Sequence, residues 1–320
     1  MRTLTGLQPS GALHLGNYFG SIKQMLDAQE KEDLFIFIAN YHALTSLKDG
    51  ELLRQNTLDA AINFLSLGID PNKSTFWVQS DVKEVLELYW VLSNVTPMGL
   101  LERAHSYKDK VAKGIPANHS LFSYPVLMAA DILMYQTNVV PVGKDQVQHV
   151  EITRDLAIKF NNEYGEIFTI PEFRTSDEIS TVPGLDGAKM SKSYNNTIGI
   201  FLNEKELKKA CSSIVTDSTP LEEPKDPHSC NVFALAKLFL NEDEQDELIL
   251  RYKSGKEGYG HFKMYLKELI WDYFEPHRRK REYYLKNSNE VKDILNEGAK
   301  KARVVARESI EKVREVVGIF

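Results

Sequence analysis

The chain has few cysteines and no long apolar run. Cys211 and Cys230 are the two cysteines among 320 residues, and no Cys or His partners lie at ligand spacing around them, which argues against a disulfide framework and a zinc site. No segment approaches the roughly 18 consecutive apolar residues of a membrane span. The first residues also lack the apolar core of a signal peptide. We therefore expect buried or unreactive thiols and a soluble, cytoplasmic protein with no membrane partner.

Acidic residues outnumber basic residues in the whole chain, but basic residues are in excess near the C-terminus. The chain has 39 Lys and Arg against 45 Asp and Glu, a net charge of -6, whereas residues 251–320 contain 17 basic and 11 acidic residues. Because phosphate contacts are local, a mildly acidic protein can still bind a polyanion through such a cluster. A solvated helical surface is the alternative interpretation.

Strand and helix patterns alternate through the first 200 residues. Segments with helical spacing separate β-rich runs at 3–7, 33–39, 74–80 and 138–143. Strands that alternate with helices indicate a mainly parallel sheet. We predict an α/β fold over 1–200, a Rossmann-like parallel sheet with helices on both faces. The stretch at about 81–136 is too long for a minimal crossover and is predicted to be a helical insertion.

Beyond residue 200 the β-rich runs disappear. Prolines and acidic residues in 216–230 indicate a connecting loop. Around this loop, helical patterns occur at 202–213, 231–253, 259–275 and 287–317. A length of 320 residues at about 150 per domain also suggests two domains. We predict a second, α-helical domain over 201–320.

A turn with two glycines follows the first predicted strand. Residues 8–17 read Gln-Pro-Ser-Gly-Ala-Leu-His-Leu-Gly-Asn and lead into a helix. Gly11 and Gly16 allow the backbone to approach a ligand closely, and the helix N-terminus favours an anion. The turn matches neither the dinucleotide fingerprint nor the P-loop, which weighs against hydride transfer and P-loop chemistry. We interpret the turn as a phosphate-binding site. Helix capping by Ser10 is the structural alternative.

A second segment, 183–193, carries two lysines three residues apart. It reads Pro-Gly-Leu-Asp-Gly-Ala-Lys-Met-Ser-Lys-Ser, so that serines flank Lys192. Lysines on a mobile loop can neutralise the charge that grows on a leaving pyrophosphate, mainly in the transition state. A solvated surface loop is the alternative interpretation.

Together the two segments resemble the two signatures of the class I aminoacyl-tRNA synthetases. The loop Lys-Met-Ser-Lys-Ser at 189–193 matches its signature in full. The other signature is usually His-x-Gly-His; here His14 and Gly16 are present and Asn17 replaces the second histidine. This replacement resembles the tryptophan-specific branch of the family.

A helix predicted around 124–133 presents three functional side chains. Tyr124, Met128 and Asp131 are spaced by four and three residues and therefore share one face. A thioether packs well on an aromatic ring, and a carboxylate that only accepts hydrogen bonds suits an indole N–H that only donates. A buried carboxylate also needs a partner, since leaving it unpaired would cost several kcal/mol. Local bonding by Asp131 and core packing by Met128 explain the spacing equally well.

The segment 140–154 adds a second candidate binding region. Gly143 lies at the carboxyl end of a predicted strand, where α/β sheets bind ligands. Asp145 and Gln148 have the spacing of a capping pair at a helix start. Capping alone would account for Asp145.

The resemblance to the tryptophan-specific synthetases covers essentially the whole chain and is strongest at 6–20, 124–155 and 189–193. It implies ATP-dependent ligation of L-tryptophan to tRNA(Trp) through a tryptophanyl-adenylate, with release of AMP and diphosphate. It implies ATP as a substrate that enters with Mg2+, no tightly bound cofactor and no protein metal site. It further implies that the helical domain reads the anticodon and that a homodimer forms through the inserted helices.

The resemblance also assigns roles to residues. Catalytic roles are implied for Lys189, Lys192 and His14. ATP binding is implied for Gln8, Pro9, Ser10, Gly16, Asn17, Gly143, Lys144, Asp145, Val182, Lys189, Met190, Ser191, Lys192 and Ser193. Tryptophan binding is implied for Asp131, Met128, Tyr124, Gln146, His42 and Val140. Contact with ATP or tRNA is implied for Lys108, Lys110 and Lys113, although a plain exposed loop is the favoured interpretation of these three lysines.

Three alternatives stay open on the sequence. A tyrosyl-specific relative would share the fold and the lysine loop but should present a pair that binds a hydroxyl group. A small-molecule nucleotidyltransferase with a His-x-Gly-His turn needs neither the lysine loop nor a helical tail. A catalytically inactive tRNA-binding paralogue could retain the fold without the reaction.

Overall fold

The computed structural model describes residues 1–9, 11–104, 107, 112, 114, 118–175 and 182–319. Its centre is a parallel sheet in the order β3-β2-β1-β4-β5. The strands are β1 (Arg2–Leu7), β2 (Asp33–Ile38), β3 (Ser74–Val78), β4 (Val139–Pro141) and β5 (Glu172–Arg174). From β1, the chain adds β2 and β3 on one side and then β4 and β5 on the other side. The carboxyl ends of β1 and β4 therefore flank the crevice where such sheets bind ligands. The predicted α/β fold class is confirmed.

Both faces of the sheet are buried, as parallel sheets require. Along β2, Leu34, Ile36 and Ile38 belong to one core cluster. Phe35 and Phe37, which alternate with them, belong to a second cluster on the opposite face. The near-continuous apolar run of β2 follows from burial on both sides. Strand β5 was missed, because its three residues Glu-Phe-Arg are exposed and form no apolar run.

One face is covered by the predicted insertion and by the helix that follows β4. The helices α5 (Glu84–Val95), α6 (Met98–Glu102) and α8 (His119–Met134) lie between β3 and β4 in the chain. Helices α5, α8 and α9 (Val147–Tyr164) pack on one another. They place α8, with its candidate binding face, against the sheet.

The opposite face carries the elements that follow β1 and β2. The first turn leads into α1 (Leu15–Asn17), a π-helical turn at Tyr18–Ile22 and α2 (Lys23–Gln29). After β2 come α3 (Asn40–Ala43) and α4 (Gly50–Leu67). Asp49 begins α4 by accepting hydrogen bonds from two backbone N–H groups, and Gly68 ends it with a φ of 118°.

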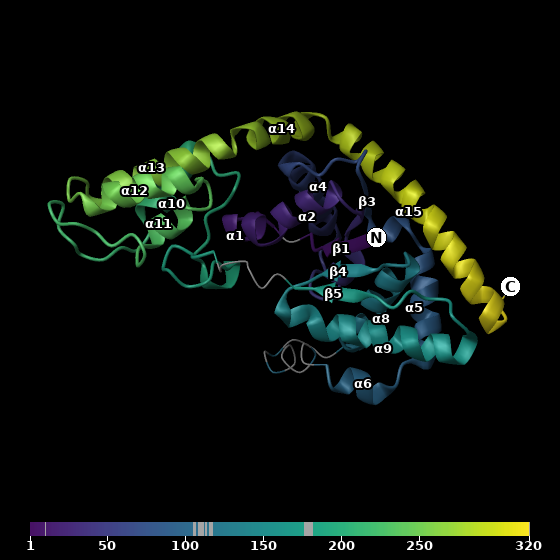
Figure 1. Cartoon of the computed structure of the whole chain (residues 1–320). Coiled ribbons are helices and arrows are strands. Elements are labelled where there is room, and N and C mark those ends of the chain that lie inside the picture. The colour runs from purple at the N-terminus through teal and green to yellow at the C-terminus, as the bar shows by residue number, and fades with distance from the viewer. Residues whose placement is uncertain are drawn as a thin grey trace.

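The second half is helical, as predicted. Helices α10 to α13 project away from the sheet, and α14 connects them to α15, the yellow helix that runs back along the sheet (Figure 1). Their bounds are α10 (Glu204–Ser212), α11 (Asn231–Ala236), α12 (Glu242–Lys253), α13 (Tyr259–Tyr273), α14 (Glu275–Lys286) and α15 (Ser288–Val317). The range 231–253 holds two helices rather than one, because Asn241 caps α12 reciprocally with Glu244.

Helix α15 packs on the sheet rather than within a helical bundle. It contacts the edge strand β3 together with α4, α5 and α8. Small residues allow this close approach: Ala299, Ala302 and Ala306 are buried, and the backbone of Gly298 lies directly over Phe76. A helix that covers an edge strand shields its unpaired backbone groups from other chains. The last helix of the predicted second domain therefore contributes to the core of the first.

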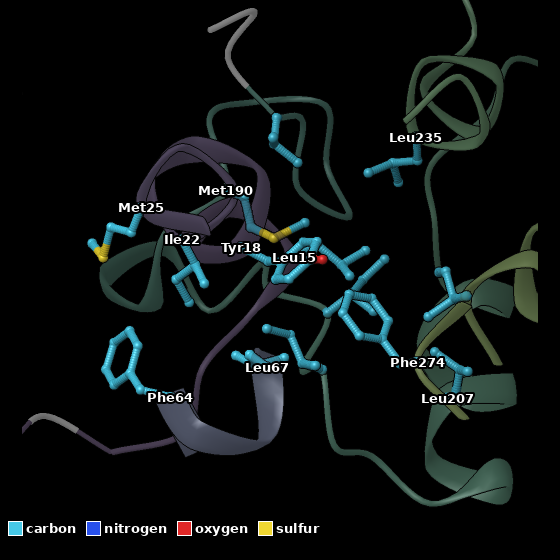
Figure 2. Close-up of a cluster of buried hydrophobic side chains, with 14 of the residues drawn as sticks. Leu15, Tyr18, Ile22, Met25, Phe64, Leu67, Met190, Leu207, Leu235 and Phe274 are labelled. Carbon is cyan, nitrogen blue, oxygen red and sulfur yellow. The ribbon is translucent and has the colours of Figure 1, made fainter. Parts of the chain in front are cut away.

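One core cluster joins the first turn to the helical region. Figure 2 shows Leu15 and Tyr18 beside Met190, with Leu207 and Leu235 contributed by helices α10 and α11 and Phe274 by the turn between α13 and α14. The two cysteines are buried, as expected, and burial raises the pKa of the Cys211 thiol to about 12. Among the residues that the structure describes, no helix is long and apolar enough to cross a membrane.

Replacing Gly298 should destabilise the protein. A methyl group at Gly298→Ala would lie 1.8 Å from the carbonyl oxygen of Phe76, so α15 would have to move off β3. We expect a loss of about 3 kcal/mol in the free energy of unfolding, measured by denaturant titration. The control is Gly260→Ala in α13, where nothing lies within 4 Å of the added methyl group. An equal effect of both substitutions would contradict this account of the packing.

Candidate functional site

A cavity of about 860 Å³ opens at the carboxyl ends of β1 and β4. Its walls come from the first turn, from α3, from α8 and from the segment after β4. The sequence-predicted residues in its lining are Gln8, Asn17, His42, Tyr124, Met128, Asp131, Val140, Gly143 and Gln146. The predicted helix face of Tyr124, Met128 and Asp131 therefore points into the ligand crevice of the sheet.

The lysine loop is docked on the first turn. The backbone N–H of Gly16 donates to Sδ of Met190 at 3.3 Å. Two backbone hydrogen bonds of 3.0 Å, from Leu15 to Ile198 and from Ile200 to Leu13, fasten the chain after the loop to the same turn. The Lys192 ammonium lies 3.7 Å from the position of a β-carbon on Gly11. Two segments more than 170 residues apart in sequence thus form one structure.

A buried asparagine organises the lysine loop. Asn196 accepts a hydrogen bond from the backbone of Ser191 at 2.8 Å. Its amide group donates to Asp186 at 2.7 Å and to the carbonyl of Lys189 at 3.2 Å. Sequence reasoning missed Asn196, because an asparagine after a lysine loop carries no pattern of its own. These hydrogen bonds hold the loop in a defined conformation, so it is not simply a solvated surface segment.

The remaining predicted residues lie outside the cavity lining or outside the described residues. Val182 and Met190 are buried in the core cluster beneath the loop. Ser10 lies outside the described residues, as do Lys108, Lys110 and Lys113. The described residues that lie outside the cavity lining are Pro9, His14, Gly16, Lys144, Asp145, Val182, Lys189, Met190, Ser191, Lys192 and Ser193.

His14 is a neutral side chain beside the lysine loop. It is 7% exposed, and burial, together with the positive charge of Lys192, lowers its pKa to about 4. Its Nδ1 has no hydrogen-bond partner among the described residues. Removal of water from around the Lys192 ammonium lowers the pKa of that lysine as well. At neutral pH, His14 can therefore act as a hydrogen-bonding group, while the positive charge at this edge comes from lysine.

The side chain of Asn17 completes the first turn. Its Oδ1 accepts the backbone N–H of His14 at 3.1 Å, three residues earlier. An asparagine in the first helical turn thus satisfies a backbone donor that the helix leaves unpaired. The same side chain lines the cavity. This contact gives a structural reason for the asparagine at the position where the family signature usually has histidine.

Asp131 is a buried carboxylate with two side-chain partners. It is 2% exposed, and its Oδ2 lies 2.8 Å from Nε2 of His42. Gln79 donates from Nε2 to Oδ1 at 2.9 Å and to Oδ2 at 2.8 Å. Because both partners come from other elements, the alternative of local bonding is wrong. Gln79 was missed, although a polar residue directly after a buried strand is a usable signal.

A second set of hydrogen-bonded side chains includes two residues of the cavity lining, Tyr124 and Gln146. The Tyr124 hydroxyl lies 2.6 Å from Nε2 of His149, and Nδ1 of His149 lies 2.9 Å from Oε1 of Gln146. An amide oxygen only accepts, so Nδ1 carries the proton and Nε2 accepts from the Tyr124 hydroxyl. Gln146 in turn donates to Asp145 at 2.9 Å. Sequence reasoning placed Tyr124 and Gln146 together but missed the buried His149 that links them.

The predicted capping pair at the start of α9 is wrong. Helix α9 begins at Val147 with Gln146 as its N-cap residue, and no side chain caps it. Asp145 instead accepts from Gln146, and Gln148 donates to the carbonyl of Arg103 at 3.4 Å. A short 3-10 turn at Lys144–Gln146 shifts the helix start past Asp145.

Among the described residues, no group of three or more His, Cys, Asp or Glu side chains is placed to hold a metal ion.

The chain is similar to known proteins along its whole length. The family model for class I tRNA synthetases (W and Y) matches residues 1–275. A tryptophan–tRNA ligase of Campylobacter jejuni is 66% identical over 319 residues, with 100% of both chains covered. One of Fusobacterium nucleatum is 57% identical, with 99% of this chain and 98% of the relative covered. The crystal structure of tryptophanyl-tRNA synthetase from Campylobacter jejuni, complexed with ADP and tryptophan, has a TM-score of 0.97 at 66% identity and 100% coverage of both chains.

Acid should destabilise the protein partly through His14. Its pKa is about 4 in the folded chain against 6.5 for an ordinary histidine, so the unfolded chain takes up the proton first. The stability that the folded protein gains by keeping His14 neutral is fully present above pH 6.5 and is lost as the pH falls toward 4. We expect His14 to account for about 2 kcal/mol of the decrease in unfolding free energy between about pH 7 and 4.5.

Denaturant titrations at the two pH values test this expectation. The decrease should become smaller in His14→Asn and stay as in the unsubstituted protein in His228→Asn, which replaces an exposed histidine. A decrease of the same size in His14→Asn would show that His14 does not titrate as described.

Proposed function

The chain belongs to the class I tRNA synthetases of the tryptophan and tyrosine family, and we propose how its cavity performs their reaction. Its activity is the ATP-dependent ligation of tryptophan to tRNA, since tryptophan–tRNA ligases match it over their full length at 66% identity. The tyrosyl-specific and inactive alternatives are not favoured by this match. The roles of individual residues below are our proposal.

The buried carboxylate of Asp131 is the observation that carries the tryptophan assignment. It faces the cavity on α8 in the company of Met128 and Tyr124. The indole N–H is a donor and the carboxylate an acceptor, so the two groups match inside an apolar pocket. We assign Met128 and Val140 to the indole ring, and His42 to the carboxylate of Asp131. We assign Tyr124 and Gln146 to the α-amino group of tryptophan. The oxygen of Tyr124 suits a cation, because its proton is directed to His149.

The first turn and the lysine loop form the proposed ATP site. The docking of Met190 on Gly16 brings Lys192 to Gly11, which is where a phosphate group on the turn would need a positive charge. We assign the ribose and adenine side to Gly143, Lys144, Asp145 and Val182. Further contacts are proposed for Gln8, Pro9, Ser10, Asn17, Ser191 and Ser193. Magnesium would enter bound to the oxygens of ATP and to water, as part of the substrate.

The proposed reaction has two steps. A carboxylate oxygen of tryptophan attacks the α-phosphorus of ATP, and the bond to the β-phosphate oxygen breaks to release diphosphate. A terminal ribose hydroxyl of the tRNA then attacks the acyl carbon of the adenylate and AMP leaves. The attacking carboxylate is already ionised, so the first step needs no general base. Catalysis consists of positioning and of charge neutralisation by Lys189 and Lys192.

We assign the anticodon to the helical domain predicted over 201–320. Helices α10 to α13 project away from the sheet, as an element that reaches a distant part of the tRNA must (Figure 1). The excess of basic residues in 251–320 favours contact with a polyanion. Because ATP, tRNA and tryptophan meet where proteins are made, we propose that the protein works in the cytoplasm.

We also propose a homodimer that pairs through the inserted helices. Large apolar side chains are exposed there, with exposed fractions of 41% for Leu86, 68% for Trp90 and 63% for Met98. Leu86 and Trp90 lie one helical turn apart on α5, and Met98 begins α6. Neighbouring exposed apolar side chains are typical of an interaction surface. Sedimentation velocity at micromolar concentration should give a dimer, and a monomer would contradict the proposal.

Removing the second lysine of the loop should slow adenylate formation. We expect Lys192→Ala to lower the rate of tryptophan-dependent exchange of labelled pyrophosphate into ATP by about 100-fold or more, because charge on the leaving diphosphate is no longer neutralised. Tryptophan binding, measured by calorimetry, should change far less. The control is Lys205→Ala, an exposed lysine on α10. An unchanged exchange rate would remove Lys192 from the mechanism.

The function itself is tested by the same exchange assay with each of the twenty amino acids and no tRNA. Exchange with tryptophan alone is expected. Exchange with tyrosine would keep the reaction class and overturn the role given to Asp131. Exchange with none of them would contradict adenylate formation in the absence of tRNA.

A further inference from the structure

Gln79 holds the carboxylate of Asp131 in one orientation. This glutamine follows β3 directly and is 2% exposed. Its Oε1 accepts the backbone N–H of Tyr41 at 3.0 Å. A backbone N–H can only donate, so the amide oxygen must face Tyr41 and the amide NH2 must face Asp131. The orientation of the amide is thus set by the main chain, and the orientation of Asp131 is set by the amide.

The contacts of Asp131 leave room for one more donor. Oδ2 accepts from both His42 and Gln79, whereas Oδ1 accepts from Gln79. An ionised carboxylate has about four lone-pair positions, so these contacts leave one, on Oδ1. The Nε2 atoms of His42 and Gln79 are already directed at the carboxylate. This end of the cavity therefore presents an acceptor to a ligand.

A neighbouring pair of hydrogen bonds keeps the two partners at a fixed separation. Asn40 donates from its amide to the hydroxyl of Ser80 at 2.8 Å and accepts the backbone N–H of Ser80 at 3.1 Å. Ser80 follows Gln79 in the chain, and Asn40 precedes Tyr41. The pair ties α3, which carries His42, to the turn that carries Gln79. The segments that carry the two donors of Asp131 are therefore held together.

We infer that Gln79 is a positioning residue that sets the recognition of the indole N–H by Asp131. Gln79 holds the carboxylate of Asp131 so that the remaining acceptor position, on Oδ1, is available to an indole N–H. The inference rests on the proposed role of Asp131 as the group that reads the indole nitrogen.

The test compares two substrates that differ in one ring atom. Exchange of labelled pyrophosphate into ATP is measured with tryptophan and with its isostere β-(benzothiophen-3-yl)alanine, in which sulfur replaces the ring N–H. In Gln79→Met, kcat/KM for tryptophan should fall by about tenfold or more, mainly through KM, while the value for the isostere changes by about twofold or less. A merely structural role would lower both values equally, and that result would overturn the inference.

Matched variants separate the possible causes. Gln79→Asn keeps a buried amide that is too short to span Tyr41 and Asp131, so it should narrow the same substrate ratio if Gln79→Met does not fold. Gln29→Met replaces another buried glutamine, which bonds to the backbone of Gly68 and Asp70, and should leave the ratio unchanged.

Asp131→Asn distinguishes this inference from the proposed function on which it rests. If Asp131→Asn leaves the preference for tryptophan over the isostere intact, the role of Asp131 is wrong and the inference falls with it. If Asp131→Asn abolishes the preference but both Gln79 variants retain it, the role of Asp131 stands and the inference about Gln79 alone is overturned.

Discussion

A carboxylate buried in an apolar cavity requires hydrogen-bond donors, and the site is built around this requirement. Asp131 receives them from Gln79 at the end of β3 and from His42 on α3. These elements come from three separate parts of the chain, and the parallel sheet brings their ends to one edge. The carboxylate keeps one acceptor position for a ligand because its other positions are filled by protein donors.

The phosphate side of the site depends on a second long-range contact. The lysine loop is shaped by Asn196 and docked through Met190 on Gly16, so the positive charge of the loop faces the first turn. Burial keeps His14 neutral there. In the proposed function, the site thus separates an acceptor for the amino-acid side chain from positive charge for the nucleotide.

The helical half is joined to the sheet through the same region. The Tyr18 hydroxyl lies 3.0 Å from that of Tyr273 on α13, and Arg281 on α14 bonds to Asp59 and Asn63 on α4. Helix α15 then covers the edge of β3. The helical half is therefore attached to the elements that follow β1 and β2, which also carry the first turn and His42.

The sequence by itself determined the fold class, the helical second half, both signature segments and the helix face of Tyr124, Met128 and Asp131. Each of these leaves a local pattern, in apolar periodicity, in glycine and lysine spacing, or in steps of three and four along a helix. Gln79, His149 and Asn196, the start of α9 past Asp145, and the return of α15 to the sheet were decided by the tertiary structure. Their roles depend on partners far away in the chain, and a hydrogen bond between distant segments imposes no spacing that a single sequence can display.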